Sequence, residues 1–227
     1  MKKNYVLLSG LILAASFGFA QNLQVNSSMQ GTPKLTTLEK EIINKNVNTK
    51  APGDTLFYED FANAIPTGWT VVNIAANSNN WIWANTAPGG QYSTNIGALN
   101  STTGTNGYMS LPADLYNTPF PPGGPVAMDT YFQSPAITIN PTAAAVLLKF
   151  EHYQRYCCNA SNQLVAEVSN DNVNWTTINA TGPVGGTRGP NTATPNAETL
   201  EFNVSGTLAN QTTAYVRFRS TANSHYF

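Results

Sequence analysis

The residues of this sequence that are best suited to catalysis are carboxylates. Histidines and cysteines that could assist them are few, with two of each. Glu151 and Glu167 lie in segments typical of neighbouring strands, where two facing carboxylates would resemble the acid pair of a glycosidase. Ion pairing is the simpler explanation, because basic residues occupy outward positions of the same predicted strands, namely Lys149, Arg155, Arg217 and Arg219. The sequence therefore favours binding over catalysis.

Histidine and cysteine add little to this set. His152 takes an inward strand position, where a hydrogen-bonded core histidine is more common than a catalytic base, and His225 lies near the end of the sequence. Cys157 and Cys158 are adjacent, so they cannot close a loop as an ordinary disulfide does. Free thiols, a disulfide between the two neighbours and bridges to another chain all stay open. A metal site would need further cysteine or histidine ligands.

Residues 146–155 show the longest two-residue alternation in the sequence and predict a central β-strand. Leu148, Phe150 and His152 fall on one face of it. The other face carries charges of both signs and a ring that could stack on a sugar, which suits a polar ligand. The predicted ligand-binding residues on this outward side of the sheet are Glu151, Tyr153, Arg155, Glu167, Arg217 and Arg219. A face covered only by solvent or by a partner is the alternative.

Composition excludes one class of function. Only 10% of residues are charged, against about 25% in an average globular chain. From Ala51 onward, ten acidic residues stand against five basic residues. The domain therefore lacks the basic surface of a nucleic-acid-binding protein.

The N-terminal segment predicts export. Lys2 and Lys3 precede a mostly apolar run from Val6 to Phe19, and small residues lead to Ala20, so residues 1–20 are interpreted as a signal peptide cleaved after Ala20. This run is short for a membrane span, and no second run of about 18 apolar residues follows. We expect a secreted or cell-surface protein without a membrane span in the mature chain. Residues 21–53 are expected to be a linker or leader.

The remaining residues, 54–227, predict one domain of short strands. About ten segments rich in β-branched and aromatic residues are separated by Gly, Pro and Asn, and no long amphipathic helix follows Lys45. This pattern predicts an all-β fold, a two-sheet antiparallel β-sandwich. Trp81 and Trp83 alternate in one such strand, and at least one of the two rings is expected in the core. The Gly- and Asn-rich stretch 85–129 predicts long surface loops.

The order of several short motifs resembles the cleaved-adhesin and MAM-like jelly-roll domains of exported Bacteroidetes proteins. The resemblance covers roughly residues 55–227. It is carried by Glu59-Asp60-Phe61, Ile65-Pro66-Thr67-Gly68-Trp69, Trp81-Ile82-Trp83, Gln133-Ser134-Pro135-Ala136-Ile137, Leu148-Lys149-Phe150-Glu151-His152, Glu167-Val168-Ser169-Asn170-Asp171 with Trp175, and Val216-Arg217-Phe218-Arg219.

This resemblance implies a concanavalin-like jelly roll, a non-catalytic role and a calcium ion at the edge of the sandwich. Glu59 and Asp60, with loop carbonyls, would begin the set of about six to eight oxygen ligands that calcium takes. Domains of this family continue into a strand that closes the sheet. We expect that strand to lie beyond Phe227, which leaves open any metal site built from it.

Residues and resemblance together predict a secreted or cell-surface adhesion module that binds glycan or an extracellular protein. The alternative is an accessory domain of a larger exported hydrolase, a peptidase or a glycosidase, whose catalytic part lies elsewhere. The full-length reading frame would separate the two.

Overall fold

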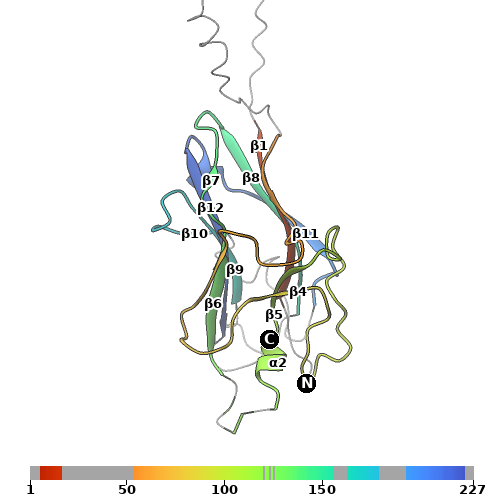
Figure 1. Cartoon of the computed structure of the whole chain (residues 1–227). Helices are drawn as coiled ribbons and strands as arrows, with labels where there is room; N and C mark the ends of the chain where they lie inside the picture. The colour runs from red at the N-terminus through yellow and green to blue at the C-terminus, as the bar shows by residue number, and fades with distance from the viewer. Residues whose placement is uncertain are drawn as a thin grey trace, which may run out of the picture.

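The chain forms a sandwich of two antiparallel sheets, which appear as two facing layers in Figure 1. The computed structural model describes residues 6–16, 54–119, 121–122, 124, 126–155, 163–178 and 193–222. The predicted linker at 21–53, the two cysteines and His225 lie outside these residues. The predicted all-β sandwich is confirmed.

Among the residues that the structure describes, each sheet has six strands. The first sheet has the order β11 (Glu198–Asn203), β8 (Ala145–Gln154), β1 (Val6–Ser16), β5 (Tyr108–Leu111) and β4 (Ile82–Ala84), with β2 (Asp54–Glu59) paired to β1. The second has the order β10 (Thr176–Thr177), β9 (Gln163–Ser169), β12 (Thr213–Ala222), β6 (Met128–Gln133) and β3 (Thr70–Asn73), with β7 (Ile137–Thr138) paired to β12.

Helices are minor elements of the described chain. The labelled ones, α2 (Ala113–Tyr116) and α3 (Ser205–Leu208), are single turns. In the part of the chain that the structure describes, no helix has the length and apolar character needed to cross a membrane.

Strand β8 has the register that its sequence predicts. Leu148, Phe150 and His152 are buried, whereas Lys149 and Glu151 are only partly covered. This two-residue alternation arises because successive side chains of a strand point to opposite faces of the sheet. The inward face of β8 therefore contributes to the core between the layers.

The core is built around one phenylalanine of β6. The Phe132 ring is fully buried and lies 4.8 Å from Trp81, 5.2 Å from Phe218 and 5.6 Å from Trp69, centroid to centroid. Trp81 is 1% exposed, which confirms that at least one of the two alternating indoles belongs to the core. Trp83 is partly buried against the same cluster. Offset and edge-on ring contacts of this kind stabilise the cluster beyond the apolar area it buries.

Strand β1 is formed by the apolar run that the sequence predicts to be an export signal. It lies between β8 on one side and β5 and β2 on the other, antiparallel to all three. A run of this length and apolar character fits both a signal and a buried strand, so composition alone does not distinguish them. Its removal on export stays a prediction.

Candidate functional site

Two surfaces carry the residues that the sequence singles out, and they lie on opposite sides of the sandwich. Glu151, Tyr153 and Arg155 belong to or follow β8 in the first sheet. The other three, Glu167, Arg217 and Arg219, belong to β9 and β12 in the second. The expectation of one shared binding face is therefore wrong, and Glu151 and Glu167 do not form a facing carboxylate pair. The two carboxylates lie apart because β8 and β9 belong to different sheets, and no residue pattern in the sequence predicted that arrangement.

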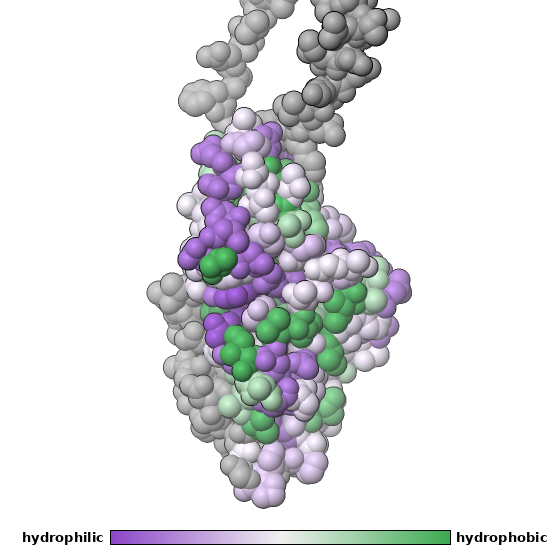
Figure 2. All heavy atoms as spheres, turned by 60° about the vertical axis from the view of Figure 1, so that its left-hand side comes forward, coloured by the Kyte–Doolittle hydropathy of each residue, from purple (hydrophilic) through white to green (hydrophobic). Residues whose placement is uncertain are grey.

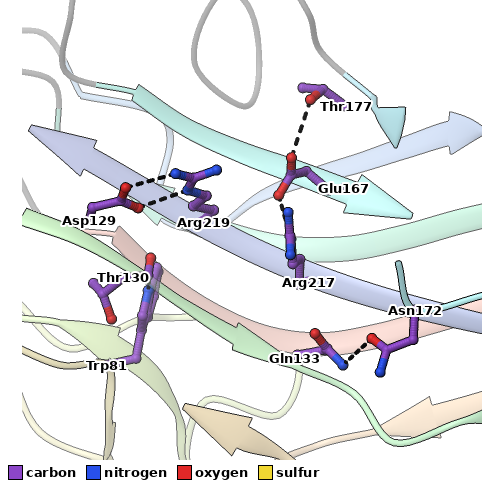
Figure 3. Close-up of polar contacts among 9 residues, drawn as sticks. All are labelled: Trp81, Asp129, Thr130, Gln133, Glu167, Asn172, Thr177, Arg217 and Arg219. Atoms are coloured by element: carbon purple, nitrogen blue, oxygen red, sulfur yellow. Dashed lines mark hydrogen bonds and ion pairs between the residues drawn. The ribbon is translucent and has the colours of Figure 1, made fainter. Parts of the chain in front are cut away.

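The outer face of the second sheet carries what we call the arginine cluster: Arg217, Glu167, Arg219 and Asp129 (Figure 3). Arg217 lies opposite Glu167 in the pairing of β12 with β9. Its Nε donates to Glu167 Oε2 at 2.6 Å. Arg219 lies two residues further along β12, and its Nε and Nη2 donate to the two oxygens of Asp129 at 2.8 and 2.7 Å. Alternation along β12 thus places both guanidinium groups on one face.

Aromatic rings enclose the first of these arginines. The Arg217 guanidinium carbon lies 4.0 Å from the centre of the Trp175 ring and 4.8 Å from the centre of the Tyr131 ring. A cation over an aromatic face is attracted by the quadrupole of the ring, by about 0.5 to 2 kcal/mol. Only 14% of the Arg217 side chain is exposed. The group is therefore held in place on three sides.

The second pair is more open to water. The side chains of Arg219 and Asp129 are 30% and 26% exposed. The hydrogen bond that Arg219 donates to Asp129 raises the pKa of Arg219 above its ordinary value. A two-pronged contact at such an exposure contributes about 1 kcal/mol or less.

The arginine cluster neutralises its own charges. Each arginine is paired with one carboxylate, and Thr177 and Glu167 are also joined, by a longer contact of 3.4 Å. Next to the cluster, Gln133 Nε2 donates to Asn172 Oδ1 at 2.8 Å. Figure 2 shows the molecule with this side turned forward, and hydrophilic residues there lie beside smaller groups of hydrophobic ones. The contacts within the cluster mainly hold β6, β9 and β12 together.

The outer face of the first sheet carries a cleft of about 180 Å³. We call it the first-sheet cleft. Its lining includes Tyr58, Thr102, Thr103, Lys149, Phe150, Glu151 and Thr199. Tyr58 comes from β2 and Thr199 from β11, whereas the threonines at 102 and 103 belong to the loop that precedes β5. Three strands and one loop therefore meet around this hollow.

Hydrogen bonds from the loop fix the carboxylate of the cleft. The backbone N–H of Thr102 donates to Glu151 Oε2 at 3.0 Å, and the Thr102 hydroxyl donates to Oε1 at 2.9 Å. Each carboxylate oxygen can accept a second hydrogen bond, so Glu151 keeps acceptor capacity for a ligand. The cleft thus has a positioned acceptor, with Lys149 as a donor beside it.

The phenol of the cleft is the most open of its rings. Tyr58 is 51% exposed. Partial burial, and next the nearby Asp60 carboxylate, raise its pKa, so the hydroxyl keeps its proton at neutral pH and remains a hydrogen-bond donor. No sequence pattern singled out Tyr58 or Lys149 for binding. The burial of β2 does not alternate, because its pairing with β1 shifts register within the strand, so no two-residue pattern pointed to Tyr58.

Two of the predicted ligand-binding residues of β8 are less accessible than expected. Tyr153 packs against the cluster of Leu99 and Tyr108, and its burial raises its pKa. Arg155 is 9% exposed and pairs through its backbone with Ala193. The loop before β5 and the segment before β11 cover this end of the sheet. A residue that the strand pattern places on the outer face of the sheet is therefore not necessarily exposed to solvent.

The expected calcium ligands are engaged within the protein. Glu59 Oε1 accepts from the Phe61 N–H at 2.8 Å, and Asp60 accepts from the Ala62 N–H at 3.2 Å and from Asn106 Nδ2 at 2.9 Å. Among the residues described, no three His, Cys, Asp or Glu gather at one point. Two carboxylates fall short of the about six oxygens that calcium takes. Calcium binding stays a prediction.

Two further buried polar residues, one histidine and one aspartate, have clear hydrogen-bond partners. His152 is 0% exposed, and its Nε2 lies 2.9 Å from Glu198 Oε2, which confirms the expected core histidine. Asp114 is also 0% exposed and accepts from the Tyr92 N–H at 2.7 Å and from the Ser93 hydroxyl. It anchors the loop at 90–93 to α2. A single aspartate in a loop-rich stretch gave no signal of this role.

No protein family, curated protein or solved structure matches the chain.

Proposed function

We propose that this protein is a non-catalytic binding module that acts outside the cytoplasm and recognises glycan at the first-sheet cleft. The observation that carries the proposal is the half-exposed Tyr58 ring beside Lys149 and Glu151 in one hollow. An aromatic face offers an apolar platform for the C–H side of a sugar ring. The charged groups offer strong directional hydrogen bonds to hydroxyl groups.

The threonines of the cleft add to this chemistry. Thr103 and Thr199 each bring a hydroxyl, which can donate or accept, to the same lining. Small-molecule sites commonly combine an apolar platform with a few converging polar groups. A hollow of this size suits one or two sugar units better than a protein surface.

The arginine cluster is the weaker candidate for recognition. Its two arginines already bind two carboxylates, and the Arg217 side chain is 14% exposed. A ligand would have to replace contacts as short as 2.6 Å before it gained any of its own. This comparison favours the first-sheet cleft.

The experiment is a glycan-array screen of the purified full chain, followed by calorimetric titration of any sugar that is retained. Tyr58→Ala should weaken binding about tenfold or more, a loss of about 1.4 kcal/mol. Glu151→Gln should weaken it less, because the amide keeps one acceptor. Melting midpoints of both variants show whether the fold is intact.

Tyr92→Ala provides the matched control, since Tyr92 is a tyrosine of 37% exposure that does not line the cleft. It should bind as the unmodified chain does. Equal losses for Tyr58→Ala and Tyr92→Ala would refute the assignment of the site. Retention of no sugar by the folded chain would refute the glycan proposal itself.

A further inference from the structure

The first-sheet cleft has one wall that is not a strand. It is formed by residues 98–103, which we call the cleft loop and which precede β5. Thr102 and Thr103 of this loop line the cleft, and Thr102 donates both hydrogen bonds that hold the Glu151 carboxylate. The position of the loop therefore decides how Glu151 is presented to a ligand.

The side chain of Asn196 binds the cleft loop with both ends of its amide. Its Nδ2 donates to the backbone carbonyl of Ala98 at 2.9 Å, and its Oδ1 accepts from the backbone N–H of Asn100 at 2.8 Å. These two backbone groups flank Leu99, which is 3% exposed and packs against Tyr108. The amide thus supplies the donor and the acceptor that a neighbouring strand would otherwise offer to this piece of backbone.

A bulge at the edge of the first sheet precedes β11 and contains Asn196. The Thr194 N–H donates to the Gln154 carbonyl at 2.8 Å, and the Thr194 hydroxyl accepts from the Gln154 N–H at 3.0 Å. Further along, Glu198 pairs with His152. The chain therefore advances four residues, from Thr194 to Glu198, while β8 advances two. Bulges redirect side chains, and they are frequent beside functional sites.

The two hydrogen bonds of Asn196 give the cleft loop a direction that its other contacts do not give. Burial of Leu99 holds the loop down, but an apolar contact is non-directional. The hydrogen bond from the Gly104 N–H to the Ser101 carbonyl, at 3.2 Å, closes a turn between neighbouring residues of the chain. By contrast, the Asn196 amide fixes the backbone at Asn100, two residues before Thr102.

We propose that Asn196 is a positioning residue of the first-sheet cleft. By holding residues 98–100, it keeps Thr102 within hydrogen-bond distance of Glu151, and so keeps the carboxylate in the orientation that a ligand meets. Asn196 is not among the described residues that line the cleft. The inference rests on the proposed sugar binding at this cleft and extends it to a residue that acts through the loop.

The first test measures amide hydrogen exchange in the folded full chain by NMR. Asn196→Ala removes both hydrogen bonds, so the amides of Asn100 and Thr102 should exchange about tenfold faster or more. Because Asn196 is exposed, the melting midpoint should fall by no more than about 2 to 4 °C.

The second test repeats the glycan array with the Asn196→Ala variant. The protein concentration at half-saturation should rise roughly threefold to tenfold, because affinity falls with the fraction of molecules whose loop is in place. A residue that only stabilised the fold would not produce this loss while most of the melting midpoint is kept.

Asn203→Ala is the matched control. Asn203 is also an exposed asparagine, and its Oδ1 accepts from the Ser205 backbone N–H at 3.0 Å. It lies at the opposite end of β11 from Glu198, beside Leu147. Its loss should leave the exchange of the two loop amides and the binding on the array unchanged. Equal weakening of binding in both variants would indicate a general loss of stability and would overturn the positioning role.

Two further outcomes would overturn the inference while sugar binding by the unmodified chain stands. One is unchanged exchange at Asn100 and Thr102 in the Asn196→Ala variant, since burial of Leu99 would then be enough to hold the loop. The other is faster exchange with unchanged binding on the array, since the loop would then move without affecting the site. Retention of no sugar by the unmodified chain would refute the glycan proposal instead, and the exchange of the two amides would then decide whether Asn196 positions the loop.

Discussion

Replacing Phe132 by alanine should be among the most destabilising single changes in the core. The ring is fully buried and contacts four other rings, at centroid distances of 6.1 Å to Phe61, 5.6 Å to Trp69, 4.8 Å to Trp81 and 5.2 Å to Phe218. A buried Phe→Ala change costs about 3 to 5 kcal/mol through lost contacts and the cavity it leaves. Each good aromatic pair adds about 0.5 to 1.5 kcal/mol. We expect a loss near the upper limit.

The neighbouring Tyr131→Ala variant is the matched control. Tyr131 precedes Phe132 in β6 but lies on the outer face, against the Arg217 guanidinium at 4.8 Å. Its removal should cost about 1 to 2 kcal/mol, from the cation–π contact and the part of the ring that is covered. Urea unfolding followed by tryptophan fluorescence suits this test, because Trp69 and Trp81 lie beside Phe132.

The two variants together test the register of β6. In a domain of this size 1 kcal/mol corresponds to about 2 to 4 °C, so Phe132→Ala should lower the melting midpoint by about 10 to 20 °C and Tyr131→Ala by about 2 to 8 °C. A one-residue slip exchanges the two faces of a strand. An equal or larger loss for Tyr131→Ala would therefore contradict the inward assignment of Phe132.

Three smaller predictions follow from local contacts. Hydrogen bonds from the side chain and backbone of Asn174 and from the backbone of Val173 hold the pKa of Asp171 well below its usual value. The contribution of Asp171 to the stability of the fold is therefore complete above about pH 5 and is lost as the pH falls. The difference in melting midpoint between the unmodified chain and Asp171→Asn should shrink from about pH 7 toward about pH 2. Asp114→Ala should cost about 3 kcal/mol in urea unfolding, because the Tyr92 N–H and the buried Ser93 hydroxyl lose their acceptor, and an unchanged midpoint would contradict the anchoring role. Gly107 has a φ of +130°, and a Cβ there would lie 2.3 Å from the Trp83 indole nitrogen, so Gly107→Ala should cost about 2 to 4 kcal/mol, whereas Gly206→Ala, with open space around it, should be nearly neutral in the same melt.

Local pattern predicted the strands well. Residues 145–154 alternate so regularly that the buried positions of β8 follow directly from the two-residue period. The same holds for Val216 and Phe218 in β12, which are buried between the outward arginines. Where one face of a strand is apolar and the other charged, burial leaves only one register.

Strand partners were beyond the reach of the sequence. Glu151 and Glu167 have similar local surroundings in the sequence, yet they lie in different sheets because β8 and β9 do. The sequence of neither strand specifies which strand it pairs with, because backbone hydrogen bonds are alike for all residues. The loop that brings Thr102 to Glu151 is polar and without periodicity, so its path over the sheet followed from no pattern. The pairing of residues 6–16 as a strand did not follow from the sequence, because an apolar run of this length suits an export signal and a buried strand equally well.

The edge strands of the two sheets influence whether folded copies aggregate at high protein concentration. In the described part of the chain, the edge strands β3, β4, β7 and β10 have four, three, two and two residues, and the longer β2 and β11 carry charged residues, Asp54 and Glu59 in β2 and the exposed Glu201 in β11. A margin that short, or that charged, gives another molecule few backbone groups to pair with in register. Folded copies should thus resist fibre formation even when packed densely, and Glu201→Val should promote precipitation before it changes the melting temperature.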